Sequence, residues 1–82
     1  MEKEYDELYN KLMNSEKYLE IRCKLENSNL ENMLIWEMEK NIPQLLEKIA
    51  SSTSGSHKQF LINSCSAAIK KVNHIIAELN IN

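Results

Sequence analysis

Two histidines and two cysteines are the side chains of this chain best suited to acid–base, nucleophilic or metal chemistry. His57 and Cys65 stand two helical turns apart, so a Cys–His nucleophile is conceivable. A catalytic thiolate needs an electropositive and partly exposed setting. Cys65 instead falls in an apolar stripe with Leu61, Ala68 and Val72, which favours burial. We therefore interpret this cysteine as a core residue.

The remaining polar candidates also lack the spacing that chemistry requires. His74 has Glu78 four residues later, but neither histidine has another acidic neighbour at helical spacing, which is typical of solvated surface histidines. The cysteines and histidines match no zinc pattern, and no Glu-x-x-His pair indicates a di-iron site. The loop that ends at Ser56 could hold an anion, but it lacks the Gly-x-x-x-x-Gly-Lys pattern, so capping is favoured. We expect no enzyme, no metal and no cofactor.

Length and composition predict one all-α domain over residues 1–82. The chain has only one Gly (Gly55) and one Pro (Pro43), so few turns are possible. The formal charge is −2, with ten acidic and six basic side chains up to Asn41 but two acidic and four basic after it. The last helix could therefore complement the first, within one bundle or across a dimer. At this size stability often depends on disulfides, metals, unusually regular helices or a second subunit, so we expect a homo-oligomer.

Apolar residues recur at helical spacing in three segments, about residues 2–26, 29–50 and 56–79. Ser28 and Glu31 have the spacing of a capping box, as do Ser56 and Gln59, and a serine-rich loop covers 51–55. The last helix has one apolar stripe: Leu61, Cys65, Ala68, Ile69, Val72, Ile75, Ile76 and Leu79. This pattern predicts a small antiparallel three-helix bundle.

Two positions could raise the number of helices to four. Pro43 predicts either a kink or a fresh helix start capped by Asn41. Asn14-Ser15 could interrupt the first helix, with Ser15 capping a second piece.

The first two helices carry apolar residues outside their main stripes. Met1, Tyr5, Leu8, Leu12, Leu19 and Cys23 form one stripe of the first helix. Tyr18, Ile21 and Leu25 form a second stripe, which is a separate surface if the helix is continuous but joins the core if Ser15 starts a new helix. Met33 and Trp36 point away from the inner face of the middle helix.

These five residues predict a docking surface. In an antiparallel pairing Tyr18, Ile21 and Leu25 come just before the turn, with Met33 and Trp36 just after it, so the five could form one patch. Tyr, Trp and Met are enriched in protein interfaces. The competing interpretation buries both faces of the middle helix within the bundle. We expect a non-enzymatic protein-protein interaction module, a homodimer or a small adaptor or inhibitor, whose partner is another protein or a second copy of itself.

The alternative function is a small dimeric DNA-binding transcriptional regulator. Its last helix would present lysine and asparagine to DNA: Lys58, Asn63, Lys70, Lys71 and Asn73. The set lacks arginine and the whole chain is acidic, so nucleic acid is the less favoured partner.

Cysteine usage and hydropathy predict a cytoplasmic protein. Cys23 and Cys65 lack Cys-x-x-Cys spacing and read as small core residues of a reducing compartment, although a bridge between them is geometrically open. The first residues are acidic and have no signal-peptide stretch, and no run reaches membrane-spanning length. We expect no membrane contact.

Overall fold

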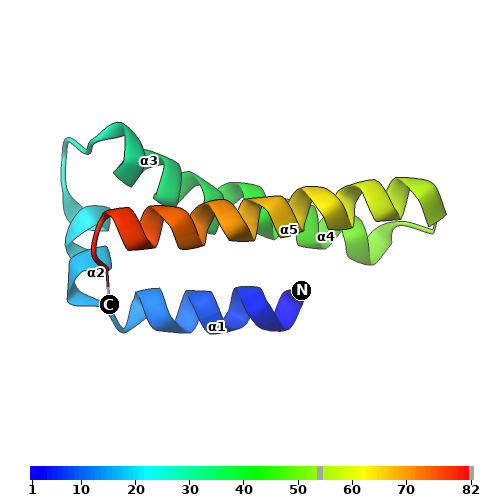
Figure 1. Cartoon of the computed structure of the whole chain (residues 1–82), viewed down its shortest axis with the longest axis horizontal. Helices are drawn as coiled ribbons and strands as arrows, with labels where there is room; N and C mark the ends of the chain where they lie inside the picture. The colour runs from blue at the N-terminus through cyan, green and yellow to red at the C-terminus, as the bar shows by residue number, and fades with distance from the viewer. Residues whose placement is uncertain (54, 82) are drawn as a thin grey trace.

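Helices account for all the regular secondary structure in residues 1–53 and 55–81, which are the residues that the computed structural model describes. Figure 1 shows their arrangement. The elements are α1 (Glu2–Met13), α2 (Glu16–Cys23), α3 (Asn29–Trp36), the π-helical turn η1 (Glu37–Asn41), α4 (Ile42–Ser51) and α5 (Gly55–Glu78). Because α3, η1 and α4 follow one another without a gap, they form one long middle helix, and the bundle has four helical rods.

The predicted first helix is interrupted at Asn14-Ser15, as the four-helix alternative proposed. Ser15 has an extended backbone, and its hydroxyl accepts a hydrogen bond from the Tyr18 N–H at 3.3 Å. This is the bond that an N-cap serine makes to the exposed donors of a helix start. The new helix is rotated relative to α1, so Tyr18 and Ile21 enter the core whereas Leu19 becomes partly exposed.

The middle helix passes Pro43 without a fresh start. The N–H of Ile42 donates to the carbonyl of Glu37, five residues back, which is the widened hydrogen bond of a π-turn. Asn41 keeps helical dihedrals, and its amide donates to the Glu37 carboxylate at 2.7 Å instead of capping α4. The predicted cap by Asn41 is therefore wrong, because the wider turn accommodates the proline without ending the helix.

This π-turn leaves one carbonyl without a helical donor. The α-helical partner of the Met38 carbonyl would be Ile42, whose N–H bonds Glu37 instead, and the π-helical partner would be Pro43, which has no N–H. The hydroxyl of Tyr5, on α1, donates to this carbonyl at 2.6 Å. A helix distant in sequence thus supplies the missing bond.

Capping differs at the starts of α3 and α5. Ser28 and Glu31 form the predicted capping box, and the Ser28 N–H and the ammonium of Lys24 lower the pKa of Glu31. The α5 helix begins at Gly55, one residue before the predicted start, and Gln59 donates its amide to Asn63. The predicted box of Ser56 with Gln59 is therefore wrong. The predicted loop 51–55 is shorter, because Ser51 still belongs to α4, and its residue Ser54 lies outside the described residues.

The end of α5 folds back onto the core. Asn80 has a positive φ of 57°, its N–H donates to Ala77, and the N–H of Ile81 donates to Ile76 at 3.0 Å. This pair of bonds is a Schellman motif, in which asparagine tolerates the left-handed position. Ile81 is consequently buried, and Lys17 of α2 donates to the Leu79 carbonyl at the helix end.

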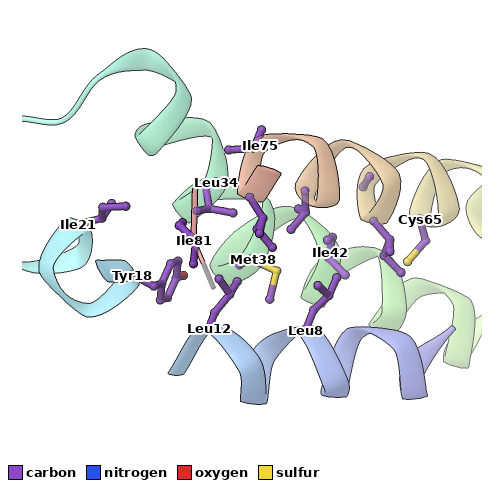
Figure 2. Close-up of a cluster of buried hydrophobic side chains, with 14 residues drawn as sticks. Leu8, Leu12, Tyr18, Ile21, Leu34, Met38, Ile42, Cys65, Ile75 and Ile81 are labelled. Carbon is purple, nitrogen blue, oxygen red and sulfur yellow. The ribbon is translucent and has the colours of Figure 1, made fainter. Parts of the chain in front are cut away.

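The core lies where α1, α2 and the middle helix meet α5. Figure 1 shows α5 running back along α3, η1 and α4, with α1 beside them and α2 across one end. Figure 2 shows the enclosed side chains, with Tyr18 and Ile21 at the α2 end. Core residues from each element are Leu8, Leu12, Tyr18, Ile21, Leu34, Met38, Ile42, Cys65, Ala68, Ile69, Val72, Ile75, Ile76 and Ile81. None of the described helices combines the length and apolar character of a bilayer span.

Candidate functional site

The structure divides the five predicted interface residues by burial. Tyr18 and Ile21 are each 1% exposed and belong to the core, so placing them on an exposed patch was wrong. The physical reason is the helix break at Ser15, which turns Tyr18 and Ile21 inward, whereas Leu25 lies beyond the end of α2. Leu25 and Trp36 are exposed, and Met33 is partly buried against the core. One contiguous five-residue patch therefore does not form.

Tyr18 is enclosed at the end of the core covered by α2. Figure 2 places its ring near Leu12 and Ile81. Burial and the negative charge of Glu39 raise the pKa of Tyr18 to about 12, whereas Arg22 acts in the opposite direction. Arg22 itself pairs with Glu39 at 2.8 Å, which ties α2 to the π-turn. Tyr18 thus stabilises the bundle as a neutral, buried phenol.

Trp36, at the end of α3, remains on the surface. Its side chain is 51% exposed, and Met33 lies one helical turn earlier. Met33 is also four residues before Glu37, so both lie on the side of the middle helix that faces α5. Leu25 is fully exposed in the loop between α2 and α3, about two turns of α3 away from Trp36.

An ion pair marks where the middle helix meets α5 beside Trp36. The Lys71 ammonium lies 3.4 Å from the Glu37 carboxylate, which is only 3% exposed and also accepts from Asn41. Both carboxylate oxygens therefore have polar partners, as a buried charge requires. The contact also joins the acidic first half of the sequence to the basic second half within one molecule.

A further exposed aromatic residue, Phe60, lies on the side of α5 that carries Lys71. It is 65% exposed, and Phe60, Ser64, Ala67 and Lys71 follow one another at helical spacing along one line of α5. Lys71 reaches Glu37 from this line, so the line borders the middle helix, and Phe60 and Ala67 on it stay exposed. We use the name seam surface for three apolar side chains near this ion pair: the partly buried Met33 and the exposed Trp36, which precede Glu37 on the middle helix, and the exposed Phe60, on the line of Lys71 in α5. Phe60 was missed, although its position off the main stripe of the last helix was the available signal.

The candidate chemical residues are dispersed. His57 and His74 are exposed on α5, whereas Cys65 is fully buried, and burial raises the pKa of its thiol. Cys23 is exposed on α2, so its prediction as a core residue was wrong, again because of the break at Ser15. Both thiols are free. Across residues 1–53 and 55–81, the acidic, histidine and cysteine side chains form no group of three placed to hold a metal ion.

Comparison with protein-family models, with curated proteins and with solved structures finds no significant match to this chain.

Proposed function

We propose that this chain is a non-enzymatic interaction module that binds another protein through the seam surface. The carrying observation is that Trp36 is half exposed, with the partly buried Met33 one turn away and the exposed Phe60 on the neighbouring helix α5. Tryptophan, phenylalanine and methionine are the residue types over-represented at protein interfaces. A half-exposed tryptophan one helical turn from a partly buried methionine has the character of a binding hot spot.

Binding at this surface acts by occlusion or scaffolding. Met33 and Trp36 provide one apolar anchor, and Phe60 provides another. Phe60 lies about 17 Å along the α5 axis from Lys71, at 1.5 Å per residue. The Lys71–Glu37 pair between them is partly solvated and gives the surface a polar centre. A partner helix laid along the seam surface could contact both anchors at once.

The DNA-binding alternative receives less support from the structure. Lys71 is engaged by Glu37, and Asn63 accepts the side-chain amide of Gln59, so two of the five proposed DNA contacts already have partners. Lys58, Lys70 and Asn73 remain exposed. Binding to duplex DNA that weakens steeply with salt would restore this alternative.

Site-specific photocrosslinking in cells tests the proposal. A photoreactive phenylalanine analogue is placed at position 36 or 60, and at position 10 on the exposed side of α1 as a control. We expect positions 36 and 60 to yield an adduct of the same mass and position 10 to yield none. The mass then states whether the partner is another protein or a second copy of the chain.

A substitution in the crosslinking experiment separates a specific contact from a chance encounter. Trp36→Ala should reduce the adduct formed from position 60 by at least about tenfold, because truncating a tryptophan hot spot costs about 2 kcal/mol or more of binding energy, which is about thirtyfold in affinity. Leu25→Ala removes an equally apolar exposed side chain outside the seam surface and should change nothing. Equal adducts from all three positions, or none from positions 36 and 60, would contradict the proposed function.

A further inference from the structure

The hairpin of α4 and α5 extends beyond the start of α1. The α5 helix has 24 residues and α1 has 12, and Figure 1 shows the N-terminus ending well short of the hairpin tip. The chain exposes 5540 Å², more than the roughly 5,100 Å² expected for a compact monomer of 9.6 kDa. At the tip only α4 and α5 pack together, whereas α1 packs beside the rest of the hairpin (Figure 1).

An apolar groove of about 350 Å³ opens at this step. Its lining comes from three elements: Met1, Glu2, Leu46, Ile49, Ala50 and Ile62. Leu46, Ile49 and Ile62 are partly exposed, and the charged groups of the lining are the Glu2 carboxylate and the Met1 amino group, which pairs with Glu4. An apolar helix face of this kind normally packs against a further helix.

The two ends of the groove carry opposite charges. Glu2 stands at the α1 end, where the neighbouring Glu4 interacts with the Met1 amino group at 4.0 Å. Lys58 is four residues before Ile62, which places it on the same side of α5 one turn nearer the tip. Between Lys48 and Ala77 the chain has no acidic residue, so Lys48 and Lys58 outnumber the single acid Glu47 near the tip.

We propose that this groove is a homodimer interface in which the hairpin tips of two copies pack against each other. A groove with one acidic and one basic end is complementary to itself after a two-fold rotation, which brings Lys58 of each copy to Glu2 of the other. Ile62 and Ile49 of the two copies then fill each other's grooves. This interface is separate from the seam surface and does not depend on the proposed function.

Sedimentation equilibrium over a range of protein concentrations tests the interface. We expect the wild type to dimerise, and Ile62→Glu to weaken dimerisation by at least about tenfold, because it places a charge in the apolar contact. Circular dichroism verifies that the variant keeps its helices. Trp36→Ala should leave the dimer constant unchanged, which separates this proposal from the function of the seam surface.

A charge exchange provides a test that does not depend on disrupting the groove. Lys58→Glu and Glu2→Lys should each weaken the dimer severalfold, since the pair occurs twice in a two-fold dimer, and the double variant should restore wild-type affinity. Lys70→Glu makes the same charge change away from the groove and should have little effect. A wild type that stays monomeric up to about 1 mM, or a double variant that adds the two losses, would overturn the proposal.

Discussion

At the scale of single residues, Tyr5 makes a hydrogen bond between two helices that the sequence around it does not predict. Its hydroxyl donates to the Met38 carbonyl, which the π-turn and Pro43 leave without a helical donor. Tyr5→Phe should lower the free energy of unfolding by about 1–2 kcal/mol, because a part-buried acceptor loses its partner.

Urea denaturation measures the effect of Tyr5→Phe, and Tyr9→Phe is its matched control. The two rings are 6.1 Å apart on the same helix, but Tyr9 is exposed. The control should change the free energy of unfolding by less than about 0.5 kcal/mol. Equal losses from both variants would refute the assigned bond.

The raised pKa of Tyr18 predicts that the folded chain loses stability at alkaline pH. Its pKa is raised to about 12 in the folded chain from 10.0, mainly by burial, so the unfolded chain releases the phenolic proton first. The contribution of the neutral phenol is fully present below pH 10 and decreases as the pH rises from about 10 to about 12, by on the order of 2 kcal/mol.

Denaturation at a series of pH values measures this decrease. Tyr18→Phe removes the titrating group while keeping the ring, so the variant should show a flatter dependence between about pH 10 and pH 12. If wild type and variant follow parallel curves, other groups cause the alkaline destabilisation.

The two cysteines should differ strongly in reactivity. Cys23 is exposed on α2, whereas Cys65 is fully buried and has a raised thiol pKa. A thiol reagent should modify one cysteine promptly at neutral pH and the second only as the chain unfolds. Peptide mapping of the rapid product should identify Cys23, and rapid labelling at Cys65 would contradict its place in the core.

At the scale of helices, Ser15 decides which residues enter the core. Its hydroxyl caps α2, and the restart of the helix there turns Tyr18 and Ile21 inward. Ser15→Ala should lower the free energy of unfolding by about 1 kcal/mol. Ser56→Ala, in the exposed first turn of α5, is the control and should cost less than about 0.5 kcal/mol. An unchanged free energy of unfolding in Ser15→Ala would show that this hydroxyl does not stabilise the start of α2.

Local signals were sufficient for some helix boundaries and insufficient for others. The capping box of Ser28 and Glu31 was predictable because both partners lie within one helical turn. The π-turn before Pro43 was not, because its stability involves Tyr5 and Lys71 from distant helices. The break at Asn14-Ser15 was recognised only as an alternative, since both periodic patterns around it are consistent with the sequence.

At the scale of the whole molecule, the candidate site was predicted only in part. The outward direction of Trp36 follows from helical spacing alone and agrees with its 51% exposure. The burial of Tyr18 and Ile21 depended on the helix break, and the addition of Phe60 depended on which side of α5 faces the middle helix. Both features depend on how the helices pack in three dimensions, which the spacing of apolar residues in the sequence does not predict.

The measurement that tests the seam surface most directly is acrylamide quenching of the fluorescence of Trp36, the only tryptophan in the chain. With half of the side chain exposed, acrylamide should quench the dilute protein readily, and the emission should be close to that of a solvated indole. Strong protection from acrylamide together with blue-shifted emission would show that the indole is enclosed, and the seam surface could not then be a docking site.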